Sequence, residues 1–466
     1  MFKKNYSKLI VFFMIFTILT LTGFKCKKVV NPEKVTLNYW RMADDVSAFE
    51  KIIKDFRQLY PSITINYRQI VPEEYELELL NALAEDSGPD IVSIPSTWIK
   101  KYQSKISYMP PSVKLPLARL EGTIKEELVT EYVTVPTISL RKLKEDFLDI
   151  VNEDVVIKTE IVNAQIKQTT LEDKIYGLPL SVDTLVLYYN KDLLNRAGIS
   201  VPPKTLDRDF PDAVERLTKL DKKGNILVHG TALGTSNNIK YATDILSLFM
   251  MQNGSQMTTD NAVSFNAAPD GAGRDFNPGR GALEFYANFA KPTNRLYTWN
   301  KDSQSEIDLF TRGKLAFMFG YFSDLDAIRI NAPKLNFGVA TMPQIAGNPE
   351  VNYATYSVEA VLKKSKRQNE AWGFVQFVAS DKEVIKYLQK TKKPTVLKSL
   401  INGQLEDLDT GTWARQLLTA KTWYRGKNPE KMNFAFKEMI DTALREDIEE
   451  IQDVIDLAAQ RVQNSY

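Results

Sequence analysis

Cysteine and histidine are almost missing from this sequence of 466 residues, which contains one cysteine, Cys26, and one histidine, His229. The chain therefore has too few histidines and cysteines to favour a Ser-His-Asp triad, a Cys-His pair or a histidine-rich metal cluster. A single cysteine also excludes a disulfide within the chain, so the fold must depend on its hydrophobic cores. We expect His229, which precedes a glycine-containing turn, to be structural.

Nucleotide-binding and metal-binding motifs are missing as well. The chain contains no Walker A, GxGxxG, HExxH, CxxC or EF-hand pattern. The sequence therefore implies no cofactor, while a calcium ion held by a loop stays open.

Neither sign of charge dominates the chain, because 60 lysines and arginines are mixed with 58 aspartates and glutamates. No basic block beyond the first few residues marks a nucleic-acid binder, so no nucleic-acid partner is expected. Hydrophobic residues make up 44% and charged residues 25% of the chain, as in a soluble globular protein. The length is too great for one ordinary core and favours two domains.

Residues 1–30 have the pattern of a targeting segment. Three lysines in the first eight residues precede an apolar run from Leu9 to Leu21, which is typical of a secretory signal. The run is too short to predict a stable membrane span, and an uncleaved amino-terminal anchor is the alternative. Both interpretations predict that the rest of the chain is exported.

The only cysteine follows this run directly. The segment Gly23-Phe24-Lys25-Cys26 resembles a bacterial lipoprotein signal, in which Cys26 becomes the lipid-modified first residue. Lys25 departs from that pattern, which has a small residue before the cysteine. The resemblance implies a lipid anchor at the outer face of the cytoplasmic membrane or in the periplasm, and a free thiol is the alternative.

The chain after the targeting segment begins with alternating strands and helices, which indicates a parallel α/β sheet. Period-2 alternation and helical apolar spacing predict, in order, strand 35–40, helix 49–60, strand 63–67, helix 72–83 and strand 91–94. Residues 140–151 are predicted to be one helix, whereas 112–139 show no clear pattern. The apolar segment 175–189 is predicted to cross between the two domains.

Strands and helices alternate again further along the chain. We expect helices at 243–251, 282–290, 305–312 and 368–379, and buried strands at 315–319 and 337–340. Residues 436–455 place isoleucines and leucines at helical spacing and predict one or two amphipathic helices. Trp372 lies on a continuous apolar helix side and is expected in a core, whereas Trp299 cannot be placed.

Several of these segments together resemble the family 1 extracellular solute-binding proteins, which include maltose-binding protein. The motifs that carry the resemblance are Tyr39-Trp40, Gly88-Pro89-Asp90, Tyr176-Gly177-Leu178-Pro179-Leu180, Tyr188-Tyr189-Asn190-Lys191-Asp192-Leu193-Leu194 and Phe310-Thr311-Arg312-Gly313-Lys314. They occur in the family's order over nearly all of residues 35–466. Each motif alone is weak, but the ordered set is specific.

The resemblance implies an α/β fold of the type II periplasmic-binding-protein kind, with two lobes joined by crossing strands. Lobe 1 would comprise 35–180 plus 358–415, and lobe 2 would comprise 183–350 plus 416–466. A solute, most simply a carbohydrate, would bind in the cleft between the lobes, which would close on it by hinge motion. The protein would act as a monomer that delivers the solute to the permease subunits of an ABC importer, and would not be an enzyme.

Carbohydrate recognition combines aromatic rings, which cover the apolar faces of sugars, with carboxylates and amides that bind hydroxyl groups. Residues of these kinds follow predicted strands at their carboxyl ends, near the predicted crossings, or at family positions that contact the solute. The candidate ligand-binding residues are Trp40, Asp44, Thr97, Trp98, Asp183, Tyr321, Phe322, Tyr356, Trp423, Tyr424 and Arg425.

Three of these candidates have equally good structural interpretations. Asp44 can cap the helix that follows it, Asp183 can be a solvated hinge residue, and Arg425 can pair with a carboxylate. Thr97 and Trp98 stand where the maltose binder has charged residues, which argues against maltose itself.

Alternative functions remain compatible with the sequence. A glycoside hydrolase would also carry two carboxylates near a sugar. A sensor or adhesion module could use the same fold without transport. An importer of a polyamine, a peptide or glycerol phosphate would keep the fold and change the solute.

Overall fold

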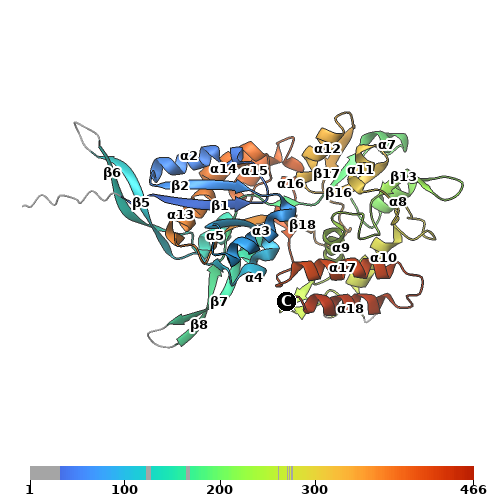
Figure 1. Ribbon diagram of the computed structural model, residues 1–466. Helices are drawn as coiled ribbons and strands as arrows, with labels where there is room; N and C mark the ends of the chain where they lie inside the picture. Colours follow the sequence, from blue (N-terminus) through green and yellow to red (C-terminus); the bar gives the residue numbers. More distant parts are fainter. Residues whose placement is uncertain are drawn as a thin grey trace, which may run out of the picture.

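Two hydrophobic cores divide the molecule, and each is built around its own sheet (Figure 1). The computed structural model describes residues 32–121, 127–163, 168–260, 262–269, 271, 273 and 276–466. Cys26 and the predicted targeting segment therefore lie outside the described residues. Core 1 takes its buried apolar side chains from 35–182 and 354–420, and core 2 takes them from 185–353, Trp413 and 423–462.

The sheet of core 1 has the strand order β2-β1-β3-β19-β4, with β9 also paired to β19. Its strands are β1 (Val35–Arg41), β2 (Ile63–Gln69), β3 (Ile91–Pro95), β4 (Ile106–Ser107), β9 (Leu178–Pro179) and β19 (Ser357–Leu362). The first three strands are parallel, as predicted, and β19 runs antiparallel between β3 and β4. Because β3 lies in the middle of the sheet, its first four residues are all buried.

Helices cover this sheet, and their apolar stripes face it. They are η1 (Val46–Ala48), α2 (Glu50–Leu59), α3 (Pro72–Ala84), η2 (Ser96–Trp98), α4 (Ile99–Tyr102), α5 (Leu140–Asp146), α6 (Asp149–Val155), α13 (Gln368–Val378), α14 (Asp381–Thr391), η4 (Lys398–Leu400), α15 (Ile401–Leu405), α16 (Gly411–Ala414) and η5 (Leu417–Thr419). Helix α2 buries Ile52 and Phe56, one turn apart on the predicted face. Trp372 on α13 is fully buried, which confirms its predicted place in a core.

Two long hairpins extend from core 1 (Figure 1). Strands β5 (Ser112–Glu121) and β6 (Glu127–Pro136) form the first, in the region where the sequence has no clear pattern. Strands β7 (Val156–Asn163) and β8 (Gln168–Ile175) form the second.

The prediction of one helix over residues 140–151 is wrong, because the chain forms α5 and then α6. Phe147 and Leu148, between the two helices, have extended backbones and are buried in core 1. Phe147 also forms a β-bridge with Leu397. A continuous helix would point these consecutive side chains in different directions, so burying both in one core requires the break.

The sheet of core 2 has the order β12-β13-β16-β11-β17. Its strands are β11 (Val186–Asn190), β12 (Lys219–Leu220), β13 (Ile226–Thr231), β16 (Leu315–Gly320) and β17 (Phe337–Ala340), and a separate small hairpin joins β14 (Thr258–Thr259) to β15 (Ala262–Val263). Every residue of β16 is buried, as expected for a central strand.

The helices of core 2 include the predicted pair at the end of the chain, which lies along one side of this half (Figure 1). They are α7 (Lys191–Arg196), α8 (Asp209–Leu217), α9 (Ala242–Gln252), α10 (Pro278–Asn288), α11 (Glu306–Thr311), η3 (Phe322–Asp324), α12 (Leu325–Asn331), α17 (Pro429–Ala443) and α18 (Ile451–Gln463). His229 donates from Nδ1 to the carbonyl oxygen of Thr298, 2.8 Å away, and lies beside buried Trp299, so its structural role is confirmed.

Three short strands connect the two cores and pair with one another in a sheet of their own. They are β10 (Asp183–Thr184), β18 (Asn352–Thr355) and β20 (Ala420–Lys421), in the order β10-β18-β20. Gln416, which is fully buried, donates from Nε2 to the Thr184 hydroxyl (3.0 Å) and the Leu185 carbonyl (2.9 Å). Its amide oxygen accepts from the backbone N–H of Met342 at 2.7 Å. This buried amide ties the crossing strands to core 2.

Candidate functional site

A polar cavity of about 230 Å³ lies where β10 and β18 leave core 1, and we call it the hinge cavity. It is lined by Arg41, Ala43, Pro95, Leu180, Ser181, Val182, Asp183, Ser323, Thr355, Tyr356, Ser357, Glu359, Lys393 and Pro394. Most of these residues belong to core 1 or to the crossing strands, and Ser323 comes from core 2. The cavity therefore has both halves of the molecule in its wall.

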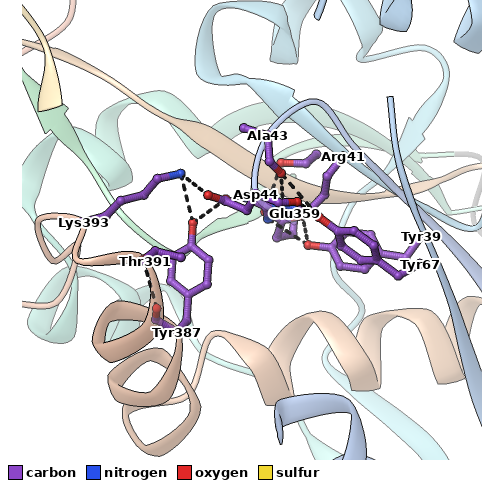
Figure 2. Close-up of polar contacts among 10 residues, drawn as sticks. Tyr39, Arg41, Ala43, Asp44, Tyr67, Glu359, Tyr387, Thr391 and Lys393 are labelled. Carbon is purple, nitrogen blue, oxygen red and sulfur yellow. Dashed lines mark hydrogen bonds and ion pairs between the residues drawn. The ribbon is translucent and has the colours of Figure 1, made fainter. Parts of the chain in front are cut away.

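A network of buried charges forms the core 1 side of the hinge cavity (Figure 2). Arg41 ends β1 and pairs with Glu359 on β19, a partner 318 residues away. Glu359 also accepts from the Tyr39 hydroxyl at 2.6 Å and from the Ser93 hydroxyl at 3.1 Å. These bonds satisfy a carboxylate that is almost completely buried, which would otherwise be very costly to desolvate.

Asp44 extends this network from the loop after β1 (Figure 2). Its carboxylate accepts from Arg41 Nη2 at 2.9 Å, from the Tyr387 hydroxyl at 2.7 Å and from Lys393 Nζ at 2.5 Å. Burial acts to raise the pKa of Asp44, but the cations Arg41 and Lys393 outweigh it and lower the pKa below its ordinary value. Asp45, not Asp44, caps the helix that follows, through the N–H of Ser47. Asp44 thus holds the two cations that line the cavity.

Asp183 lies on the first crossing strand and faces core 2. Its carboxylate accepts from the backbone N–H groups of Phe322 (2.9 Å) and Ser323 (3.3 Å), at the start of η3. Burial raises its pKa to about 7, although these two hydrogen bonds oppose the shift. Asp183 therefore joins the hinge to core 2 and also lines the hinge cavity.

A second cavity of about 120 Å³, which we call the aromatic cavity, lies between the two halves and shares Pro95 and Thr355 with the hinge cavity. It is lined by Pro95, Ser96, Thr97, Asp244, Tyr353, Ala354, Thr355, Thr422, Trp423, Tyr424, Pro429, Met432 and Asn433. Asp244 on α9 accepts from the Tyr321 hydroxyl at 2.8 Å, and burial raises its pKa to about 6. Aromatic surface and a buried acceptor thus meet in one small space.

Five of the eleven predicted ligand-binding residues line one of these cavities. Asp183 and Tyr356 line the hinge cavity, and Thr97, Trp423 and Tyr424 line the aromatic cavity. Four of the five come from the crossing strands or the segments next to them, which is where the two halves of the molecule face each other.

Trp40 and Trp98, both predicted to contact the ligand, line neither of the two cavities. The guanidinium of Arg68 lies over the Trp40 ring, 4.9 Å from its centroid. Trp98 stacks on Tyr102 with 5.6 Å between centroids, and the Lys101 ammonium lies 4.8 Å from its ring. Protein groups already occupy faces of both rings.

Tyr321 and Phe322, predicted as a stacking platform after β16, pack into core 2 instead. Both are buried, and Phe322 meets Trp413 edge-to-face at 5.0 Å. The backbone N–H of Tyr321 donates to Asp324, which turns the chain into η3 and directs these rings inward. Arg425 also binds protein groups, because its guanidinium pairs with Asp154 and Glu153. Asp44, like Arg425, is engaged by protein side chains.

Sequence reasoning missed Arg41, Glu359 and Lys393 of the hinge cavity and Asp244 of the aromatic cavity. Glu359 stands between apolar residues in a buried strand, and Arg41 ends another strand, so both break the apolar pattern of their segments. A charge inside a buried strand needs a partner, and that rule would have signalled both. Lys393 and Asp244 have no comparable local signal, because their roles depend on distant contacts.

Neither a metal-binding cluster nor a membrane-spanning helix is found in the described part of the chain. No three histidine, cysteine, aspartate or glutamate side chains there are placed to hold a metal ion. No helix within those residues combines the length and apolar character needed to cross a membrane.

The chain belongs to the bacterial extracellular solute-binding proteins, because the model of that family matches residues 39–385. A binding protein of Brucella abortus (strain 2308) is 24% identical over 339 residues, which are 71% of this chain and 68% of that protein. The galactooligosaccharide-binding protein of Bacillus subtilis (strain 168) is 25% identical over 257 residues, 53% of this chain and 55% of that one.

The fold is that of the two-lobed periplasmic binding proteins. The crystal structure of a cyclo/maltodextrin-binding protein complexed with maltotetraose superposes with a TM-score of 0.68 at 15% identity, covering 94% of this chain and 98% of that one. The two sheets, the three crossing strands and the cavities at the crossings agree with this architecture. The family and its structural neighbours are binding proteins rather than enzymes.

Proposed function

We propose that this protein is the substrate-binding subunit of an ABC importer and that it captures a carbohydrate between its two halves. The observation that carries the proposal is the pair of adjoining cavities at the crossing strands, with walls from both cores. The sugar-binding names of its relatives favour a saccharide over other solutes. Together the cavities hold about 350 Å³, within the usual range for small-ligand sites, which begins at about 300 Å³.

The proposed contacts divide between the cavities. In the aromatic cavity, Trp423 and Tyr424 would cover the apolar face of a sugar ring, while Thr97 and Asp244 bind its hydroxyl groups. In the hinge cavity, Asp183, Tyr356 and the Arg41–Glu359 and Lys393–Asp44 pairs would supply further donors and acceptors.

The working motion would be rotation of the two halves about the crossing strands. We assign lobe 1 to 35–180 and 358–415, and lobe 2 to 183–350 and 416–466. The two cores support this division except near the last crossing, where Trp413 packs in core 2 and Leu417 and Ala420 pack in core 1. The protein would act as a monomer, would deliver its solute to the permease subunits, and would carry out no catalysis. Cys26 would bear the lipid that tethers it to the membrane outside the cytoplasm.

Binding is tested by following the melting temperature and tryptophan fluorescence of the purified protein against single solutes. The panel is maltotetraose, a galacto-oligosaccharide, glycerol 3-phosphate and spermidine. A solute that binds only the folded state stabilises it by mass action and so raises the melting temperature. At 100 times its Kd the gain in the free energy of unfolding is about 2.7 kcal/mol. A saturable rise with a saccharide that is absent in Trp423→Ala supports the proposal, and a rise only with glycerol 3-phosphate or spermidine contradicts the carbohydrate.

Product analysis tests the glycoside hydrolase alternative. Prolonged incubation with the bound saccharide should return it intact, and the appearance of shorter sugars would instead indicate a glycoside hydrolase.

A further inference from the structure

Asp154 is a buried carboxylate that accepts side-chain hydrogen bonds from three residues, Tyr356, Thr422 and Arg425. It lies on α6 of core 1 and is only 9% exposed. Its Oδ1 accepts from Thr422 Oγ1 and from Arg425 Nε, each at 2.9 Å. Its Oδ2 accepts from the Tyr356 hydroxyl at 2.6 Å and again from Thr422 at 2.8 Å.

The donors to Asp154 are next to the proposed ligand contacts. Thr422 and Arg425 immediately precede and follow Trp423 and Tyr424, the aromatic pair of the aromatic cavity. Tyr356, the third donor, lines the hinge cavity. One carboxylate therefore holds both ends of the aromatic pair and one wall residue of the neighbouring cavity.

The bonds of Asp154 also connect the two cores. Its neighbours on α6, Val151 and Val155, are buried in core 1, whereas Trp423 and Tyr424 are buried in core 2. Trp423 packs there against Phe436 at 5.5 Å between centroids. The segment 422–425 is thus fixed from one half while its aromatic rings belong to the other.

We propose that Asp154 is the positioning residue of the cleft: it holds the segment 422–425 and Tyr356 in place, and Arg425 acts through Asp154 rather than by contacting the solute. The effect on solute binding rests on the proposed function, whereas the effect on the position of Trp423 does not. A carboxylate suits this role because all of its partners donate, and both of its oxygens accept. Asn in its place would offer one acceptor and direct an NH₂ group at donors.

The first test needs no solute. Acrylamide quenching of Trp423 is obtained as the difference between each variant and the same variant with Trp423→Phe. Asp154→Asn should increase that quenching by about twofold or more, because the segment opens locally when its clamp is lost. Asp149→Asn is the matched control, because Asp149 lies on the same helix but is exposed and, among the described residues, bonds only to Lys398, at 2.7 Å. The control should quench like the wild type.

The second test uses maltotetraose, with the panel's galacto-oligosaccharide as the second probe. Asp154→Asn should weaken binding by about 10- to 100-fold, as is typical when a group that orients a metal ligand is removed. The double variant Asp154→Asn/Arg425→Gln should bind as weakly as Asp154→Asn alone, because both changes break the same Asp154–Arg425 interaction. A further loss in the double variant would show that Arg425 contacts the solute and would overturn that part of the proposal.

The remaining outcomes are also decisive. If Asp154→Asn does not fold, Thr422→Val removes one donor and leaves the carboxylate intact, and it should raise quenching in the same direction. Quenching of Trp423 at the wild-type level in the folded variant overturns the proposal. Increased quenching in a protein that binds neither saccharide even as the wild type supports the role of Asp154 and contradicts the carbohydrate function alone.

Discussion

Lys101 and Glu430 form an ion pair that joins the two halves of the molecule away from the crossing strands. Lys101 Nζ lies 2.7 Å from Glu430 Oε1, and the two residues belong to α4 beside core 1 and to the first turn of α17 in core 2. The same ammonium bonds to Glu76 at 2.5 Å and lies against the Trp98 ring. Glu76 and Trp98 thus direct Lys101 towards the opposite half.

Glu430→Gln should shift the protein towards the open arrangement and weaken saccharide binding about two- to fivefold. The effect is small because Glu430 is 52% exposed, and pairs of this kind contribute about 0.2–1 kcal/mol. The dissociation rate, measured by stopped-flow fluorescence, should rise. The charge swap Lys101→Glu/Glu430→Lys should return the dissociation rate towards the wild-type value. Glu76→Gln breaks only the pair within one half and should raise the dissociation rate less than Glu430→Gln does. Equal effects of Glu430→Gln and Glu76→Gln would show that the Lys101–Glu430 pair does not hold the two halves together.

Glu359→Ala should destabilise the protein by about 3–5 kcal/mol, because it leaves the Arg41 guanidinium buried without its main partner. Urea unfolding followed by circular dichroism measures the change. Asp86→Ala is the control, since Asp86 pairs with Lys364 on the surface and its removal should cost less than about 1 kcal/mol. A change at Glu359 no larger than at Asp86 would mean that water reaches Arg41.

Asp183 should make stability fall as the pH rises towards neutrality. Its pKa is about 7 in the folded protein, above the ordinary value near 3.9. Between these values the folded state keeps a proton that the unfolded state has lost, so the contribution is full below about pH 4 and is lost as the pH rises through 7. Asp324 repels the charged form and Lys393 attracts it.

The Asp183 prediction is checked by comparing wild type with Asp183→Asn from pH 5 to 8. The melting temperature of the wild type should drop relative to that of the variant over this range, because only the wild type releases the Asp183 proton when it unfolds. Asp244, with a pKa of about 6, titrates in both proteins and cancels in the difference. A pH-independent difference would contradict the raised pKa of Asp183.

Gly177→Ala should destabilise the protein by about 1–3 kcal/mol through overpacking. A Cβ at Gly177 would lie 3.0 Å from the Glu359 carbonyl oxygen and 3.2 Å from the Val358 side chain, where β9 meets β19. Gly403→Ala is the matched control, because a Cβ there meets nothing within 4 Å and lies in α15. The control should be neutral or stabilising by up to about 1 kcal/mol. Melting temperatures compare the two, and equal values would contradict the close approach.

Local pattern was sufficient to predict the strands and helices of the first α/β units, because each has one apolar face. It gave no prediction over 112–139, where β5 and β6 form a hairpin that pairs with no other strand of the described residues. The order of motifs, rather than any single segment, indicated the family.

The candidate site was predicted only in part. Trp423 and Tyr424 were found through family position, whereas Arg41, Glu359 and Lys393 were missed because their pairing joins segments more than 300 residues apart. Tyr321 was misplaced for a similar reason, since its inward orientation depends in part on Asp244, 77 residues away in the sequence. Which side of a strand end faces a cavity is a property of the whole fold.

The order of the chain through the two cores also limits when each can form. Core 1 needs side chains up to Ala420, and core 2 needs side chains up to Val462. A ribosome that has released only the first 350 residues therefore presents neither core complete, and β3 must wait for its antiparallel partner β19, more than 250 residues later. Such long-range pairing slows folding, which keeps the growing chain threadable through an export channel until synthesis is nearly finished.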